Sequence, residues 1–199
     1  MLLLEVAEFI AVVLAIGYLI LATRAHIACW YFAFVSSAIF MFVFWDVSLL
    51  MESMLNGFYV VMAVAGWFEW RFGGTEHEGV PIRTLKLWQH GLIISSLLIA
   101  ASINGWLLQE NTNAAWPYLD AFTTWASVVT TFMVVWKILE NWLYWLLIDS
   151  ISIVLYLDRE LYLTACLFAG YVVLVIYGFL QWRKIYLQTG QKNKKKAAL

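Results

Sequence analysis

GWFEWR at residues 66–71 and GFLQWR at residues 178–183 are two versions of one hexapeptide, separated by 112 residues. The same ungapped offset aligns further residues outside the hexapeptide: Trp30 with Trp142, Asp46 with Asp158, and Tyr59-Val60-Val61 with Tyr171-Val172-Val173. A single chance motif would not keep its register over so long a stretch. The sequence therefore predicts that one structural repeat occurs twice in the chain.

The composition around these motifs is that of a membrane protein. Hydrophobic residues make up 64% of the 199-residue chain and charged residues only 13%, whereas a soluble domain has about 25% charged residues. A helix needs about 20 apolar residues to cross a bilayer, and a helix satisfies its own backbone hydrogen bonds in lipid. Charged residues, Gly and Pro divide the apolar runs into seven expected spans at about 3–22, 27–45, 53–72, 87–108, 119–136, 138–157 and 161–182.

The repeat and the span count together predict an all-α polytopic membrane protein in which one transporter domain fills residues 1–199. Repeat one covers about 3–72, a linker helix about 87–108 and repeat two about 119–183, followed by a basic tail at 184–199. Because the linker is a single span, the two three-helix repeats are expected to run in the same direction through the membrane. Parallel repeats occur in transporters, with the substrate between them near the bilayer midplane.

The distribution of basic residues predicts the orientation. If the C-terminus is cytoplasmic, eleven of the twelve Lys and Arg residues lie on the cytoplasmic side and only Arg159 lies outside. We therefore expect the inner membrane of a bacterium, with the N-terminus outside. No basic region precedes the first apolar run, so a removable signal peptide is not expected. The KNKKK run at 192–196 is expected to contact lipid headgroups and not nucleic acid.

The sixth expected span contains ENWLYWLLIDSISIVLY at residues 140–156, with a carboxylate near its middle. Trp142, Trp145, Asp149 and Tyr156 are spaced so that they share one face of a helix. A buried carboxylate in the bilayer is costly unless it meets a partner, water or a cationic ligand. Together with aromatic rings it suits a planar, positively charged solute. The alternative is that Asp149 only hydrogen-bonds to a neighbouring helix.

Asn56 and Tyr59 lie one turn apart in the third expected span. They are expected to complete the substrate pocket from the first repeat, with an ordinary interhelical hydrogen bond as the alternative.

Other chemistry finds no support in the sequence. Cys29 and Cys166 are isolated in apolar segments, and the three histidines lie at or near expected cytoplasmic connections, so no metal, haem or other cofactor site is predicted. The nucleotide motif G-x-x-x-x-G-K-[ST] does not occur, which argues against an ATP-driven pump. Asp149 has no evident nucleophile or base partner, so no catalytic residue is predicted and the chain is not expected to be an enzyme.

The pattern WxxWxxxD at 142–149 within ENWLYW, the following LYLTA at 161–165 and the 3+1+3 layout resemble the PnuC family of vitamin transporters, over nearly the whole chain. The resemblance implies facilitated diffusion of an unphosphorylated B vitamin, typically nicotinamide riboside, or thiamine in a related branch, which is trapped by phosphorylation in the cell. It also implies a homotrimer and a fold related to the SWEET sugar transporters. It carries a substrate-binding role over to Trp142, Trp145 and Asp149.

Asp149 stands where many riboside carriers of the family have Asn. A carboxylate meets the donor groups of an aminopyrimidine better than an amide does, which favours thiamine over the riboside. A SWEET-like sugar carrier and a non-transporting membrane adaptor remain as alternatives. A sugar carrier is expected to have more Asn and fewer combinations of aromatic residues with a carboxylate, and an adaptor has no reason to bury Asp149.

Overall fold

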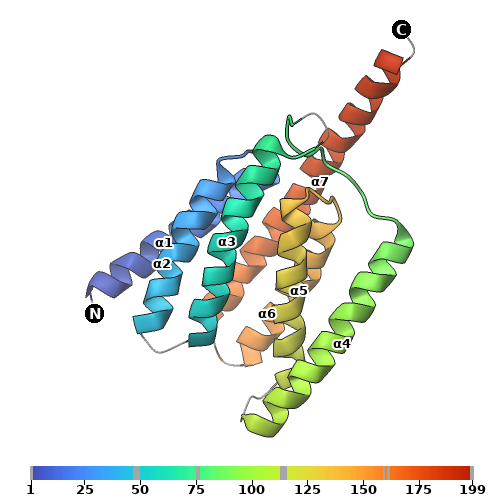
Figure 1. The fold of residues 1–199 in the computed structure, drawn as a ribbon. Helices are drawn as coiled ribbons and strands as arrows, with labels where there is room; N and C mark the ends of the chain where they lie inside the picture. Colours follow the sequence, from blue (N-terminus) through green and yellow to red (C-terminus); the bar gives the residue numbers. More distant parts are fainter. Residues whose placement is uncertain are drawn as a thin grey trace. The chain divides into compact units, whose positions relative to one another are not determined.

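The computed structural model describes residues 2–46, 50–74, 77–112, 116–158, 160 and 162–197. In these residues the chain forms seven helices and no named strand (Figure 1). The helices are α1 (Leu2–Thr23), α2 (Cys29–Asp46), α3 (Leu50–Phe72), α4 (Leu87–Asn111), α5 (Pro117–Val135), α6 (Asn141–Asp158) and α7 (Tyr162–Ala197). The prediction of an all-α chain with seven helices is therefore confirmed.

One helix is longer than expected. Helix α7 does not end near residue 182 but continues through the basic tail to Ala197. Leu, Gln and Lys favour helical backbone, and no proline interrupts the segment after Trp182. The tail is therefore an extension of the last helix as far as the described residues reach.

Five segments among the described residues are long and apolar enough to cross a membrane: Leu3–Thr23, Cys29–Asp46, Leu87–Asn111, Pro117–Val135 and Thr164–Gln191. Helices α3 and α6 are less apolar. These are the two helices that contain all six candidate site residues, since Asn56 and Tyr59 lie in α3 and the other four lie in α6. Their polar and aromatic side chains lower the mean hydropathy of the helices that hold them.

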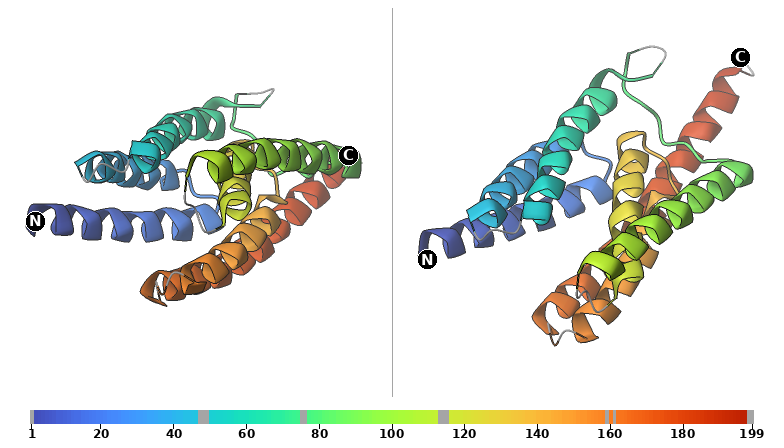
Figure 2. Two further views of the ribbon diagram at one scale, coloured as in Figure 1. Left: turned by 90° about the horizontal axis from the view of Figure 1, so that it is seen from below. Right: turned by 60° about the horizontal axis from the view of Figure 1, so that its bottom comes forward.

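The chain divides into two compact units. Unit 1 comprises Met1–Pro81 and Lys184–Leu199, and unit 2 comprises Ile82–Arg183. In unit 1, α2 packs against both α1 and α3, and in unit 2, α5 packs against both α4 and α6. Figure 2 gives two further views in which α4 lies beside α5. The expected linker helix thus packs with the second predicted repeat.

Each unit contains the same pair of packed tryptophans. In unit 1 the rings of Trp30 and Trp70 meet edge to face, with centroids 5.2 Å apart and planes at 84°. In unit 2 the rings of Trp142 and Trp182 do the same at 5.4 Å and 86°. The two pairs are related by the 112-residue offset of the repeat.

A glycine makes room for the first ring of each pair. A Cβ atom added at Gly66 would collide with the Trp30 ring, and one added at Gly178 would collide with the Trp142 ring. These glycines are the first residues of the two hexapeptides. Close packing of a helix against an indole is therefore the physical reason for glycine at these positions.

The connections after α1 and α5 also have the same backbone structure. Ala25 and Lys137 both have left-handed backbone, with φ of 52° and 47°. Their N–H groups donate to the carbonyls of Ala22 and Val134 at 2.9 and 3.0 Å. The next residue donates to the carbonyl five positions earlier in each case, which completes a Schellman motif. These local structures agree with the predicted repeat, while the parallel 3+1+3 arrangement of its copies stays a prediction.

Candidate substrate site

Asp149 is a buried carboxylate near the middle of α6. Its side chain is 5% exposed. In the described part of unit 2, no Lys or Arg side chain forms an ion pair with Asp149, and burial is the main influence of the surroundings on its carboxyl group. The carboxylate is therefore held in a low-dielectric region without a protein cation, which is the situation that a cationic ligand relieves.

Helix α7 contributes aromatic residues beside this carboxylate. The Tyr156 ring lies 4.9 Å from that of Phe168, and the Phe168 ring lies 5.4 Å from that of Tyr171. The Asp149 carboxylate also interacts electrostatically with the Tyr171 hydroxyl. We call Asp149, Tyr156, Phe168 and Tyr171 the α6–α7 cluster. It combines one buried carboxyl group with three aromatic rings.

Phe168 and Tyr171 were missed by the sequence reasoning, although a signal for them exists. The 112-residue offset aligns Asn56 with Phe168 and Tyr59 with Tyr171. The two α3 residues chosen as candidates thus have their repeat partners in the α6–α7 cluster. The repeat alignment of Asn56 and Tyr59 therefore indicates Phe168 and Tyr171 as candidate residues of the second repeat.

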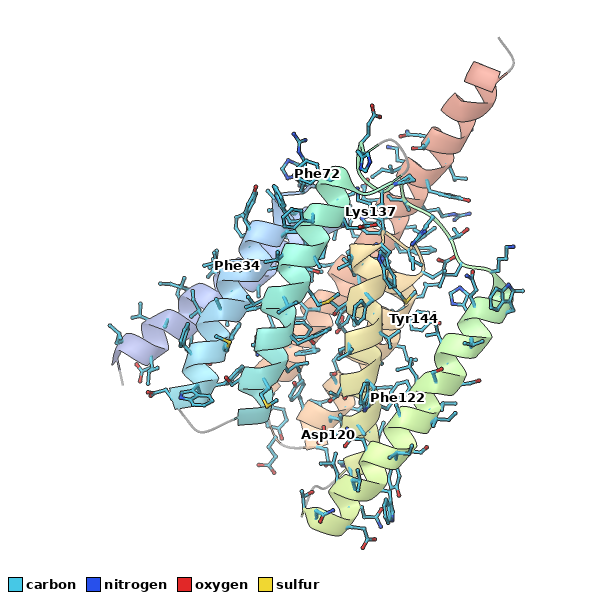
Figure 3. All side chains as sticks on the ribbon, in the orientation of Figure 1. Phe34, Phe72, Asp120, Phe122, Lys137 and Tyr144 are labelled. Atoms are coloured by element: carbon cyan, nitrogen blue, oxygen red, sulfur yellow. The ribbon has the colours of Figure 1, made fainter. Side chains whose placement is uncertain are left out.

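Trp145 lies on α6 but packs in another direction. It is half-buried and contacts an apolar cluster of Leu97 from α4, Ala126 from α5 and Ile148 from α6. Phe122 and Tyr144, both labelled in Figure 3, pack against the same cluster. Trp145 is thus on the same helix as Asp149 but packs where α4, α5 and α6 meet.

Trp142 is the most enclosed of the candidate residues. Its side chain is 2% exposed, because it lies between the ring of Trp182 and the backbone at Gly178. Its indole N–H has no hydrogen-bond partner among the described residues, and the same holds for the indole N–H of Trp30 in unit 1. An unpaired buried donor costs about 1–3 kcal/mol. The packing of the indole rings must offset that cost in both units.

Asn56 and Tyr59 are half-buried on α3 in unit 1. The ring of Tyr59 lies 5.6 Å from that of Phe58, and Tyr59 interacts electrostatically with Tyr18 of α1. Their contribution to one pocket together with α6 stays a prediction. Across the described residues, no group of three or more His, Cys, Asp or Glu side chains is placed to hold a metal ion.

Long apolar helices and a buried carboxylate beside aromatic rings define a polytopic α-helical membrane protein with the features of a small-molecule transporter. The model of the nicotinamide mononucleotide transporter family matches residues 5–184. The chain therefore belongs to this family, the PnuC family, as the sequence pattern predicted. The family and the structural neighbour described below are transporters and not enzymes.

Several bacterial relatives are similar over most of the chain. The nicotinamide riboside transporter PnuC of Escherichia coli (strain K12) is 23% identical over 203 residues, covering 89% of this chain and 84% of that protein. The PnuC of Neisseria mucosa is 25% identical over 189 residues, covering 88% and 71%. The riboflavin/roseoflavin transporter RibM of Streptomyces davaonensis is 25% identical over 128 residues, covering 62% and 60%.

A solved structure has the same fold. The crystal structure of the vitamin B3 transporter PnuC superposes with a TM-score of 0.73 at 23% identity, covering 92% of this chain and 82% of that one. The similarity confirms the helical fold of the family for this chain.

Proposed function

We propose that this protein carries an unphosphorylated B vitamin with a cationic ring across the inner membrane of a bacterium. The observation that supports this most directly is the buried Asp149 carboxylate beside the rings of Tyr156, Phe168 and Tyr171. A cationic heterocycle would neutralise the carboxylate and stack on the rings, and each cation–π contact contributes about 0.5–2 kcal/mol when desolvated. The same groups would offer little to an uncharged sugar.

Thiamine is the vitamin that this site suits best. Its thiazolium ring has a fixed positive charge, and its aminopyrimidine has donors that a carboxylate accepts well. Nicotinamide riboside is the second candidate because it also has a positively charged ring and because relatives in Escherichia coli and Neisseria mucosa are named for it. Riboflavin is the vitamin in the name of the Streptomyces davaonensis relative. Its ring system is uncharged, so its binding measures stacking on the aromatic residues without the contribution of a positive charge.

The proposal assigns roles to all the candidate residues. Asp149 accepts hydrogen bonds and balances the charge of the vitamin, while Trp142, Trp145 and Tyr156 supply or support the aromatic walls. Asn56 and Tyr59 complete the pocket from the first repeat. This assignment includes the parallel 3+1+3, SWEET-like arrangement, the outside N-terminus with a cytoplasmic C-terminus, and a homotrimer.

Binding titrations of the purified protein test the proposed substrate class. We expect saturable binding of thiamine, weaker binding of nicotinamide riboside and the weakest binding of riboflavin, because only the first two supply a positive ring to Asp149. Isothermal titration calorimetry measures the three affinities, with glucose as the ligand of the sugar-carrier alternative. Binding of glucose without any vitamin would contradict the proposal, and binding of none of the four would favour an adaptor.

Transport is expected to be downhill, with phosphorylation inside the cell trapping the vitamin. The sequence has no nucleotide-binding motif, and the buried carboxylate is occupied by the solute itself in this proposal. Proteoliposomes should therefore equilibrate labelled thiamine to equal concentrations inside and outside. Imposed proton or sodium gradients should leave that endpoint unchanged. Accumulation above the outside concentration under either gradient would overturn the facilitated-diffusion mechanism.

A further inference from the structure

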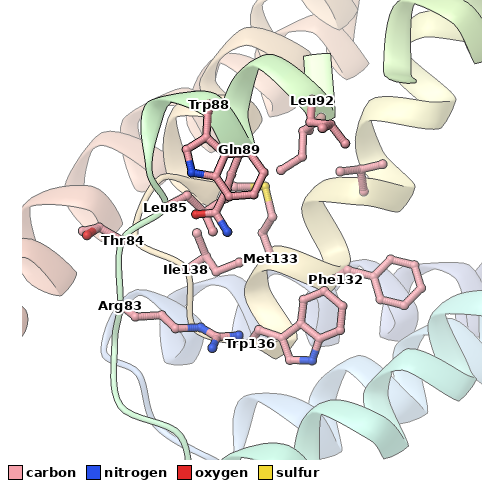
Figure 4. A pocket seen from close by; sticks show the side chains of 12 residues that line it. Arg83, Thr84, Leu85, Trp88, Gln89, Leu92, Phe132, Met133, Trp136 and Ile138 are labelled. Atoms are coloured by element: carbon pink, nitrogen blue, oxygen red, sulfur yellow. The ribbon is translucent and has the colours of Figure 1, made fainter. Parts of the chain in front are cut away.

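Unit 2 contains a pocket away from the α6–α7 cluster, at the first turns of α4 and the last turns of α5. Its volume is about 640 Å³, within the range of ligand sites. Arg83 lies on the side of Trp136, which we call the polar end, and Trp88 and Gln89 lie on the opposite side, toward Leu92 (Figure 4). The remaining lining is largely aliphatic and aromatic, and no acidic residue is among the side chains that line it.

The polar end of this pocket is held by backbone contacts distant in sequence. The Arg83 N–H donates to the Lys137 carbonyl at 3.0 Å, and the Leu139 N–H donates to the Arg83 carbonyl at 2.8 Å. The Leu85 N–H donates to a Glu140 carboxylate oxygen at 3.3 Å. These hydrogen bonds hold the segment before α4 against the connection between α5 and α6. They thereby fix the backbone position of Arg83.

The positive charge of Arg83 favours an anionic ligand in this pocket. It is the only charged side chain lining the pocket, and within the described residues it forms no ion pair. The indole and amide N–H groups of the lining residues Trp88, Gln89 and Trp136 are further donors in the pocket. A guanidinium presents a planar fork of donors that matches a phosphate group.

The other end of the pocket is apolar and suits the hydrocarbon part of a ligand. Leu92, Ile93 and Val129 are among the apolar residues of the lining, and Leu92 lies at the end away from Arg83 (Figure 4). Beyond the pocket, α4 continues with exposed apolar side chains such as Leu98 and Ile99, at 53% and 61% exposure. A free phosphate would leave this surface uncovered, whereas a molecule with an anionic head and an apolar chain would cover both parts.

We propose that this pocket binds an anionic phospholipid, with its phosphate at Arg83 and the upper part of an acyl chain along α4. Tryptophans prefer the level of the lipid headgroups, which agrees with Trp88 and Trp136 at the pocket. The predicted orientation places Arg83 at the cytoplasmic surface, where anionic lipid attracts basic residues. The pocket shares no lining residue with the proposed vitamin site and does not depend on the identity of the vitamin.

The test compares lipid retention in two charge-matched variants. The protein is reconstituted in nanodiscs of mixed phosphatidylglycerol and phosphatidylcholine, extracted and examined by native mass spectrometry. We expect about one retained phosphatidylglycerol per chain and a roughly tenfold loss of its affinity in Arg83→Gln. Arg24→Gln removes the same charge from an exposed position in unit 1 and should retain the lipid.

A second variant separates a lipid from a soluble anion. Leu92→Trp fills the apolar end and leaves Arg83 intact, so it should displace phosphatidylglycerol but not alter binding of glycerol 3-phosphate. Equal retention of phosphatidylglycerol in Arg83→Gln and Arg24→Gln would overturn the proposal. So would equal retention of phosphatidylcholine by the unaltered protein, or displacement of the lipid by an equal concentration of glycerol 3-phosphate.

Discussion

Replacement of Asp149 by Asn is expected to weaken thiamine binding by about 1.5–3 kcal/mol, the usual range for a hydrogen bond to a charged group. This corresponds to a loss of affinity of roughly 10- to 150-fold. Asn keeps the shape of the side chain and removes its charge, so the vitamin would lose the group that balances its positive ring. Affinity for uncharged riboflavin should change little, because stacking on Tyr156, Phe168 and Tyr171 is retained.

A matched control exists on the same helix. Asp158 lies at the exposed end of α6, where its carboxylate accepts a hydrogen bond from the Trp116 indole at 2.7 Å. Asp158→Asn makes the same chemical change away from the α6–α7 cluster and should leave thiamine affinity unchanged. Calorimetric titration of both variants decides the role of Asp149. Unaltered thiamine affinity in a well-folded Asp149→Asn protein would return Asp149 to a helix-packing role.

Truncation of Trp142 to Ala is expected to destabilise the protein by about 3–5 kcal/mol, the range for removing a large aromatic side chain from a packed core. The ring is 2% exposed and fills the space between Trp182 and Gly178. Trp30→Ala should cost a similar amount, because Trp30 is 3% exposed and packs in the same way in unit 1. Thermal unfolding in detergent compares the two.

The same pair of variants separates packing from substrate contact. If Trp142 also forms a wall of the vitamin site, Trp142→Ala weakens thiamine binding below the unfolding temperature, whereas Trp30→Ala does not. Trp106→Ala, at a residue that is 55% exposed on α4, provides the control for loss of an indole from the exposed surface. A Trp142→Ala protein as stable as this control would show that the buried ring contributes no net packing energy.

The residues of the candidate site were only partly predictable. The spacing of Asp149 and Tyr156 sufficed to place them on one face of a helix, because helical periodicity is a local property. Helical periodicity did not predict the aromatic partners Phe168 and Tyr171, because contact between helices depends on which helices pair and how each is rotated, and only the 112-residue offset relates them to Asn56 and Tyr59. Trp145 shares the periodicity of Asp149 and yet packs toward Leu97 and Ala126 of other helices.

The sequence by itself determined the number of helices and the approximate ends of all but α7, which continues past the expected residue 182 to Ala197. In hydrocarbon each span must satisfy its own backbone hydrogen bonds, so apolar length decides where a helix forms. The 112-residue offset likewise relates Trp30 with Gly66 to Trp142 with Gly178, since equivalent residues pack alike within each unit. Only the tertiary structure decided that α4 packs on α5 and that the Arg83 backbone N–H donates a hydrogen bond to the Lys137 carbonyl. Such contacts join residues far apart in the chain, and their pairing follows from the complementary shapes of whole helix surfaces.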